Sequence, residues 1–292
     1  MSKVFRIDIP AQGSTCVVAD SPHSGRDYPA DFDYACGLQE LRQAEDMAVD
    51  TLYNFLPALG VPLLAAEFPR AYIDVNRTDT VTRKFKAEGE QDYEGTESSL
   101  ARAAISPRAE KPIYNRKLKL SEVFNRVASY HKPYHDRLEK MIDDTHAANG
   151  KVVHLNLHSM PSVVQRGTKI NRYDVILGTR DDASADPAIT EKLRSLFAAK
   201  GYKVGVNNSG FKGAEILRRA GDPQRSRHSI QVELNRKLYM DEKALVLNAS
   251  MPKLQQDLQD IMAEFTVWCD ANVKAAPTPK RHPAEGRGPA RA

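Results

Sequence analysis

Two histidines lie where an apolar run gives way to a polar loop, a position that suits a metal ligand. His23 follows the run CVVAD in the segment SPHSG, and His158 follows the run KVVHLNL in the segment LHSMPS. Imidazole is the commonest metal ligand in proteins, and a catalytic zinc ion usually takes three protein ligands and keeps one position open. A single histidine here is more often a hydrogen-bonded structural residue, so the hypothesis depends on the pair.

The third ligand of such a site would be a carboxylate, and a helix expected over residues 38–56 offers three candidates. Glu45, Asp46 and Asp50 all lie in the segment EDMAVD. Two histidines and any one of these carboxylates would complete the ligand set of a catalytic zinc ion. The residues alone leave the choice among the three open.

His131 and His135 form a second candidate pair, because a spacing of four residues brings two side chains to one face of a helix. The segment HKPYH lacks the glutamate that metallopeptidases place beside the first histidine. Pro133 also disturbs the helix between them. We therefore prefer His23 and His158 as the metal ligands.

A strand expected over residues 228–235 contains a carboxylate in an otherwise apolar run. Glu233 lies in the segment IQVELN, where strand alternation places it on one face with Gln231. Burial of a carboxylate is costly unless the group is paired or functional. Glu233 is therefore a candidate acid or base, and the alternative is an edge strand with one face in water.

Two arginines are candidate anchors for a substrate carboxylate. Arg77 ends the segment AYIDVNR, and Arg126 lies in an expected helix over residues 120–148. A guanidinium group can hold a carboxylate through paired N–H donors. The chain contains no P-loop, no GxGxxG and no GxSxG sequence, so nucleotide binding and serine hydrolase chemistry are unsupported.

Short apolar runs that alternate with longer amphipathic runs predict the elements that would position these side chains. Strands are expected at residues 16–20, 61–68, 71–75, 151–157, 173–178, 202–207 and 228–235. Helices are expected at residues 38–56, 120–148, 187–200 and 252–273, with a kink at Pro133. This order predicts a single α/β domain, a mixed and mostly parallel central sheet with helices on both faces. Ligands of such sheets bind beyond the carboxyl ends of the strands.

The composition limits the remaining classes of protein. The 292 residues are 41% hydrophobic and 27% charged, which is ordinary for a globular protein. The three cysteines form no CxxC pair, which excludes a disulfide scaffold and a cysteine-rich zinc module. No apolar run reaches the roughly 20 residues of a membrane span, and no signal peptide is recognised. We expect a soluble, cytoplasmic protein without a membrane partner, and its oligomeric state stays open.

The two polar stretches of the chain carry separate expectations. Residues 277–292 hold four basic side chains and one acidic one, three of the four net positive charges of the chain. We expect a domain over residues 1–276 and a disordered basic tail over residues 277–292. The nearly neutral domain argues against nucleic acid as a partner. Residues 78–113 are polar and long for a simple connection, which is typical of a lid or a binding loop.

An ordered set of segments resembles the N-formylglutamate amidohydrolase (N-formylglutamate deformylase) family. The segments are SPHSGRDYP, EDMAVDTLY, AYIDVNR, YHKPYHDRL, LNLHSMPS, YDVILG, FKGAEILRRAG and HSIQVELNRKLYM. They follow the family order from residue 17 to about residue 241. The resemblance implies a fold like that of zinc carboxypeptidases and aspartoacylases, a phosphorylase/hydrolase-like arrangement.

The resemblance also implies a set of site residues. The zinc ion, one per chain, would be held by His23, Asp46 and His158, with Glu45 as the adjacent alternative to Asp46. Glu233 and Arg77 would be the catalytic groups. The residues implied in substrate binding are Arg77, Arg126, Lys212, Gly213 and Arg218. Where the family more often has two glycines, this chain has Gly213 followed by Ala214.

The reaction implied by the resemblance is metal-dependent hydrolysis of N-formyl-L-glutamate to formate and L-glutamate, a step of histidine degradation. Glu233 would take the proton of the attacking water and return it to the departing amine. The partner is thus a small N-acyl amino acid. Two other classes stay open: a related zinc hydrolase of another N-acyl amino acid or peptide, and a non-catalytic protein that binds nucleic acid through its tail.

Overall fold

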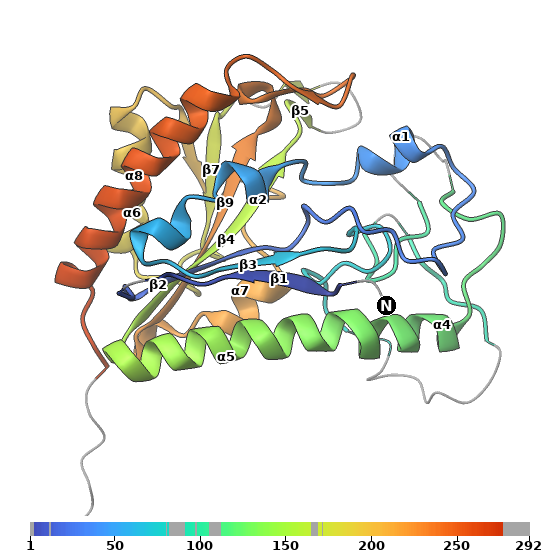
Figure 1. Ribbon diagram of the computed structural model, residues 1–292, viewed down its shortest axis with the longest axis horizontal. Helices are drawn as coiled ribbons and strands as arrows, with labels where there is room; N and C mark the ends of the chain where they lie inside the picture. Colours follow the sequence, from blue (N-terminus) through green and yellow to red (C-terminus); the bar gives the residue numbers. More distant parts are fainter. Residues whose placement is uncertain are drawn as a thin grey trace, which may run out of the picture.

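A seven-stranded sheet forms the centre of the computed structural model (Figure 1). The structure describes residues 3–11, 13–79, 81, 91–96, 98–104, 112–164, 169–170 and 172–276. The strand order is β1-β3-β2-β4-β9-β7-β8. The strands are β1 (Phe5–Asp8), β2 (Val17–Ser21), β3 (Leu63–Ala66), β4 (Val152–Met160), β7 (Val175–Gly178), β8 (Val204–Val206) and β9 (Arg227–Asn235).

Neighbouring strands of the sheet run mostly parallel. Only the β1–β3 and β7–β9 pairs are antiparallel among its neighbours. Two short ladders lie outside this sheet, β5 (Val163–Val164) with β6 (Lys169–Ile170) and β10 (Met240–Asp241) with β11 (Val246–Leu247). The expectation of a single α/β domain with a mixed, mostly parallel sheet is confirmed.

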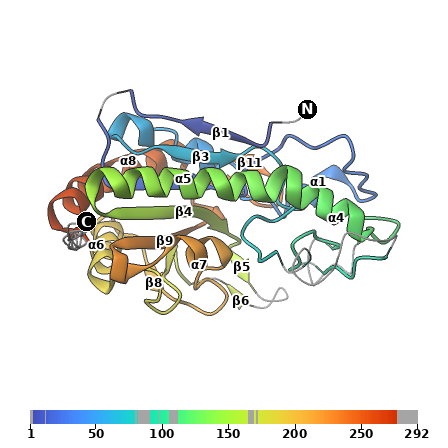
Figure 2. The same ribbon diagram turned by 90° about the horizontal axis from the view of Figure 1, so that it is seen from below.

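Helices cover both faces of the sheet (Figures 1 and 2). One face packs on α2 (Val49–Leu52), α6 (Pro187–Ala199) and α8 (Met251–Asn272), and the other packs on α4 (Leu120–Arg126), α5 (Lys132–Asn149) and α7 (Glu215–Ala220). Strand alternation divides the core accordingly: Val17 and Ala19 of β2 belong to the first cluster, and Val18 belongs to the second. No helix in these described ranges combines the length and apolar character needed to cross a bilayer.

The helix expected over residues 38–56 is interrupted, and the interruption creates a loop with a candidate ligand. The chain forms α1 (Leu38–Arg42), α2 and a 3-10 turn over Leu56–Leu59 instead of one helix. In the loop between α1 and α2, the N–H of Asp46 donates to the carbonyl of His23 at 3.0 Å. Ala48 then adopts a left-handed conformation with φ 59°. The N–H of Asp46 thus donates to a distant loop and not to a carbonyl of its own helix. The prediction of one continuous helix over residues 38–56 is therefore wrong.

The strand expected over residues 71–75 is also wrong, because this segment pairs with no strand of the sheet. The N–H of Tyr72 turns back to the carbonyl of Pro69 at 3.0 Å, and the N–H of Asp74 donates to Leu100 at 2.7 Å. The alternative interpretation of residues 228–235 as an edge strand is wrong for another reason. β9 lies between β4 and β7, so both of its edges are paired.

Pro133 is accommodated by a change of helix type. Between α4 and α5 the chain forms a π-helical turn over Val127–His131. Proline lacks the N–H of a regular helix, and its ring clashes with the carbonyl four residues earlier. A wider turn immediately before Pro133 removes both conflicts.

Candidate metal centre

His23, Asp46 and His158 meet in a buried cluster. Their potential ligand atoms all lie within 4.8 Å of one another. Oδ2 of Asp46 lies 3.4 Å from Nδ1 of His23 and 2.9 Å from Nδ1 of His158. All three side chains are at most 3% exposed. Two imidazoles and one carboxylate form a donor set suited to a catalytic zinc ion.

Three different elements bring these ligands together. His23 follows β2, His158 lies near the carboxyl end of β4, and Asp46 lies in the loop between α1 and α2. β2 and β4 are parallel neighbours, so their carboxyl ends meet at one edge of the sheet. Ser24 ties the loop to that edge, because its hydroxyl donates to the carbonyl of Asp46 at 3.1 Å.

Hydrogen bonds orient His23 with one nitrogen toward the centre of the cluster. Its Nε2 lies 2.7 Å from Oδ1 of Asp74, which can only accept, so Nε2 carries the hydrogen. The buried Nδ1 has no hydrogen-bond partner among the residues that the structure describes. Burial raises the pKa of Asp74, but Arg70, His23 and Arg102 outweigh it, so the pKa lies well below its usual range. An ionised Asp74 thus leaves Nδ1 as a free lone pair, which fits a metal ion.

His158 is oriented in the same way by a fully buried chain of polar groups. Its Nε2 lies 2.7 Å from Oδ1 of Asn156. Nδ2 of Asn156 donates to Asp20 at 2.7 Å, which fixes the amide with its oxygen toward His158. Asp20 also accepts from His154 and Tyr134. With Nε2 donating to Asn156, Nδ1 of His158 faces Oδ2 of Asp46 at 2.9 Å and is the nitrogen that a metal ion could use.

Asp46 is the carboxylate that the structure brings to the cluster. Its Oδ1 accepts from Nη2 of Arg236 at 3.1 Å, and its Oδ2 faces the two histidines. Burial raises the pKa of Asp46, but His158, His23 and Arg70 together hold that pKa well below its usual range. Glu45 instead accepts from the hydroxyl of Tyr28.

Asp50, the third candidate carboxylate, is also outside the cluster, because it pairs with Arg6 at 3.2 Å. His131 and His135 are likewise not ligands of this cluster. Their Nε2 atoms lie 3.0 Å from the carbonyl of Arg77 and 2.8 Å from the carbonyl of Val75, and they donate to these carbonyls. His131, at the end of the π-helical turn, and His135 of α5 therefore hold the segment that carries Asp74.

Glu233 lies beside the cluster because of strand register. β4 and β9 are parallel, and His158 is the direct partner of Glu233 in the ladder. Ile230, Val232 and Leu234 point into the opposite core cluster. Burial raises the pKa of Glu233 to about 7, and the carboxylate of Asp46 contributes, while His158 opposes the rise. A carboxylate poised near neutral pH suits a general base.

An open cavity of about 230 Å³ joins these groups to solvent. Its wall includes His23, His158, Glu233, Arg70, Arg77 and Arg236. A second cavity of about 260 Å³ shares Asn76, Arg77 and Ala214 with the first. The two cavities therefore adjoin, and each has room for part of a small substrate.

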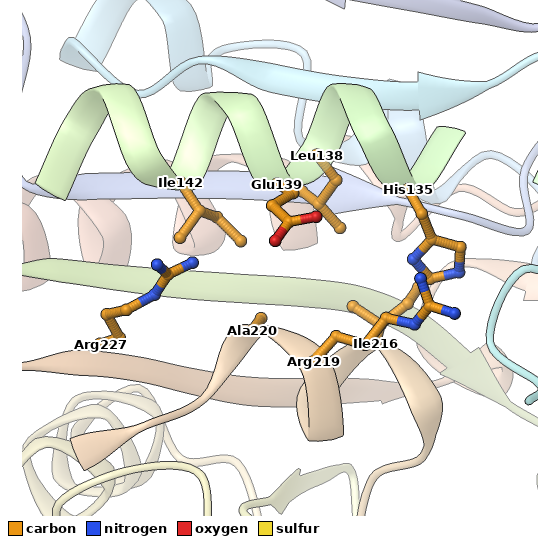
Figure 3. Close-up of a pocket in the computed structure, with 8 residues that line it drawn as sticks. All are labelled: His135, Leu138, Glu139, Ile142, Ile216, Arg219, Ala220 and Arg227. Carbon is orange, nitrogen blue, oxygen red and sulfur yellow. The ribbon is translucent and has the colours of Figure 1, made fainter. Parts of the chain in front are cut away.

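A third cavity lies away from this chemistry (Figure 3). Side chains of α5, including His135 and Glu139, face Ile216 and Arg219 of α7 across it. Its volume of about 20 Å³ is enough for a water molecule and too small for an amino acid. Its lining contains no member of the ligand cluster.

The residues expected to bind substrate are distributed unevenly. Arg77 lines both cavities and Gly213 lines the first. Gly213 has φ +98°, and an added Cβ would lie 2.3 Å from Leu217, so glycine is required there. Lys212 pairs with Asp181 at 2.8 Å. Arg218 lines the second cavity and pairs with Glu215 at 2.7 Å.

Arg126 is not brought to either cavity. It is 2% exposed, and its guanidinium lies 4.0 Å from the centre of the Tyr72 ring. It also donates to the carbonyl of Tyr72 and the hydroxyl of Tyr114. Its position in the core replaces the expected contact with substrate.

Sequence reasoning missed two arginines at the cluster, Arg70 and Arg236. Both line the first cavity and approach Oδ1 of Asp46, at 3.5 Å and 3.1 Å. Arg236 lies three residues after Glu233 in the segment VELNR, and Arg70 precedes Asp74 by four residues. These short spacings to a candidate base and to a buried carboxylate were the available signals.

Known proteins resemble this chain over most of its length. The family model for N-formylglutamate amidohydrolase matches residues 15–240. N-formylglutamate deformylases of Pseudomonas putida and Pseudomonas aeruginosa are each 31% identical to the chain. The matches cover 68% and 80% of this chain and 71% and 85% of the relatives.

A solved structure gives the same result. The crystal structure of N-formylglutamate amidohydrolase from Ralstonia eutropha JMP134 is 34% identical with a TM-score of 0.79, and the match covers 92% of this chain and 97% of that one. A protein of Agrobacterium tumefaciens, 16% identical with a TM-score of 0.64, shares the fold over 89% of this chain and 95% of its own. The chain belongs to the N-formylglutamate amidohydrolase family.

Proposed function

We propose that the protein hydrolyses N-formyl-L-glutamate to formate and L-glutamate, a step of histidine degradation, with a zinc ion held by His23, Asp46 and His158. The observation that carries the proposal is the meeting of these three groups beside Glu233. The deformylase activity named for the relatives supports the choice of substrate.

The residues present fit a zinc ion. Nδ1 of His23 is buried, has no hydrogen-bond partner among the described residues, and offers its lone pair to a metal ion. The ionised Asp46 supplies negative charge beside it. Asp74 and Asn156 hold the opposite nitrogens of the two histidines, as acceptors commonly do behind metal ligands. A zinc ion bound there would acidify water and polarise the formyl carbonyl.

Glu233 moves the proton in this proposal. Its carboxylate accepts a proton from the attacking water and later donates it to the departing amine of glutamate. Gln231 donates to Oε1 of Glu233 at 3.0 Å and so fixes the carboxyl group in the wall of the cavity. The raised pKa, about 7, lets the same group act as base and then as acid near neutral pH.

Cationic groups around the cavity bind the charges of the substrate. N-formylglutamate carries two carboxylates, and Arg77 lines both adjoining cavities. Within the described residues, the side chain of Arg77 donates to the backbone carbonyls of Ser98 and Asn76 and pairs with no carboxylate, so its charge is available to a substrate carboxylate or to the developing oxyanion. Arg70 and Arg236 are instead engaged with Asp46.

A substrate panel with formate detection tests the proposed reaction. The panel holds N-formyl, N-acetyl and N-succinyl derivatives of L-glutamate, and metal content is measured on the same preparation. Release of formate and glutamate from the formyl compound is expected. Turnover of acetyl or succinyl compounds without turnover of formyl ones would replace the proposal with a related N-acyl amino acid hydrolase.

Ligand variants test the metal in the same preparation. His158→Ala is expected to lose the metal, whereas the control His146→Ala, at an exposed histidine of α5, keeps it. Metal retained at one ion per chain in both His23→Ala and His158→Ala would contradict the ligand assignment.

A further inference from the structure

We propose that Arg180 binds the side-chain carboxylate of the substrate and sets the preference for an acidic amino acid. This inference rests on the proposed function, since it names a specificity-determining residue of the same site. Arg180 lies two residues beyond β7 and lines the second cavity, which adjoins the metal cluster through Asn76, Arg77 and Ala214.

Some arginines of the two cavities are paired with carboxylates and others are not. Arg70 and Arg236 lie within 3.5 Å of Asp46, and Arg218 pairs with Glu215 at 2.7 Å. Of the arginines lining these cavities in the described part of the chain, Arg77 and Arg180 have no carboxylate within 4 Å. These two cations are therefore available to a ligand.

The excess positive charge of the second cavity suits a substrate with two carboxylates. In the lining of the second cavity, Arg77, Arg180 and Arg218 face the single carboxylate of Glu215, which leaves two positive charges in excess. A formylated glutamate carries two negative charges. A neutral N-formyl amino acid has one, and it would leave one of the two free arginines without a partner.

The positions of Arg77 and Arg180 assign each of them to one carboxylate of the substrate. Arg77 lines both cavities and so lies nearer the metal cluster, where the scissile amide and its adjacent carboxylate belong. Arg180 lines only the second cavity. The side-chain carboxylate, two methylene groups farther from the amide, reaches that cavity when the amide lies at the cluster.

The backbone holds Arg180 firmly in this position. Its N–H donates to the carbonyl of Lys212 at 2.6 Å. Thr179 is fixed in turn by Asn207, whose side-chain oxygen accepts the N–H of Thr179 at 2.8 Å. Arg180, Asp181 and Asp182 all have positive φ angles, of 53°, 56° and 67°, which non-glycine residues rarely adopt. Such conformations persist where the surroundings fix them, and they concentrate at ligand-binding segments.

Gly213 provides the space over which the Arg180 side chain passes. A Cβ added to Gly213 would lie 3.4 Å from Cγ of Arg180. Cγ of Arg180 therefore lies close to the glycine that lines the first cavity, and Arg180 itself lines the second cavity. A preordered stem reduces the entropy lost when the guanidinium binds a carboxylate.

The experiment replaces the charge of Arg180 and measures both turnover and binding with metal-loaded protein. Arg180→Met keeps the length of the stem, Arg180→Lys restores a cation, and Arg194→Met is the control at an exposed arginine of α6. The substrates are N-formyl-L-glutamate and its neutral isostere N-formyl-L-glutamine. Binding of glutarate and of its monoamide is measured by calorimetry, which needs no turnover.

We expect Arg180→Met to raise KM for N-formyl-L-glutamate and Kd for glutarate by about 10–100-fold, the effect of losing a charge-assisted hydrogen-bond pair. The values for the neutral compounds should change less than about twofold. Arg180→Lys should recover part of the preference, and Arg194→Met should match the wild type.

Two results would overturn the role of Arg180: an unchanged preference for the acidic compounds in Arg180→Met, or a wild type that binds glutarate no better than its monoamide. The failure of the proposed function looks different. A wild type that binds glutarate through Arg180 but releases no formate would refute the deformylase reaction and support the assignment of Arg180.

Discussion

Each histidine that we propose as a metal ligand has a hydrogen-bond acceptor at its opposite nitrogen. Asp74 holds Nε2 of His23, and Asn156 holds Nε2 of His158. Asn156 is in turn fixed by the fully buried Asp20. These acceptors favour the tautomer that would present Nδ1 to a metal, so in the proposed site the metal affinity depends on residues that do not touch the ion.

Substitution of Asn156 tests this dependence. Asn156→Ala removes the acceptor of His158, so the imidazole loses its fixed orientation, and metal affinity should fall about 10–100-fold. A chelator competition titration measures the affinity, with the exposed Asn272→Ala as control. Unchanged affinity in Asn156→Ala would show that the cluster alone orients His158.

At the scale of single residues, part of the candidate site could be predicted from the sequence, for a physical reason. His23, His158 and Glu233 are polar groups at or within apolar strands, where burial without a purpose is costly. Asp46 and Glu45 are adjacent in a loop, and their directions depend on a hydrogen bond to His23 that no local pattern encodes. The core position of Arg126 depends on aromatic contacts from Tyr72 and Tyr114.

At the scale of elements, strand register and the position of α5 determine where the residues of the site lie. The parallel pairing of β4 with β9 sets Glu233 opposite His158. On one face of this sheet, α5 and the π-helical turn before it supply His135 and His131, which donate to the carbonyls of Val75 and Arg77. That helix therefore fixes a segment that has no strand partner yet positions Asp74 and Asn76.

The position of His135 predicts a specific dependence of stability on pH. Burial lowers the pKa of His135 to about 3, with His131 and Arg219 adding to the effect. Because the unfolded chain binds a proton near pH 6.5 and the folded chain does not, the free energy of unfolding decreases as pH falls below 6.5. The slope from this group is about 1.4 kcal/mol per pH unit, down to about pH 3.

His135→Gln removes this titration and keeps a donor for the carbonyl of Val75. Between pH 6 and 4.5, urea unfolding should show a slope for the variant that is smaller by about one proton than for the wild type. The carboxylates with lowered pKa values lose their contribution at still lower pH. Equal slopes in the two proteins would mean that His135 is not kept neutral by the fold.

Most elements were predictable, and the failures have a common cause. Strands such as 151–157 and helices such as 187–200 have a clear period of their own, which survives folding. The segments 38–56 and 71–75 also have a period, but distant backbone groups take over their hydrogen bonds. α7 has only six residues, too few to show a helical period.

The whole molecule joins one α/β domain to a charged carboxyl-terminal segment. Lys151, at the start of β4, donates to the carbonyls of Asp270 and Val273, and Ala276 donates to Gly150. The end of α8 is thus tied to the central sheet. The expected disordered tail, residues 277–292, and most of the polar segment 78–113 lie outside the described residues, so both expectations stay predictions.

Truncation tests the division between domain and tail. A chain that ends at Ala276 keeps all the contacts described above, so its melting temperature and turnover should match those of the full chain within error. Calorimetry and formate release measure the two quantities. A melting temperature lower by several degrees would show that residues 277–292 pack against the domain.

In the proposed reaction, Glu233 moves a proton during a hydrolysis that His23, Asp46 and His158 support by holding a metal ion. The most direct test of this role is kcat for formate release from N-formyl-L-glutamate by Glu233→Gln, which keeps the shape of the side chain and removes the proton acceptor. With metal content and melting temperature unchanged, we predict a fall of at least about 100-fold, the lower range for a general base. A kcat near that of the wild type would contradict the account.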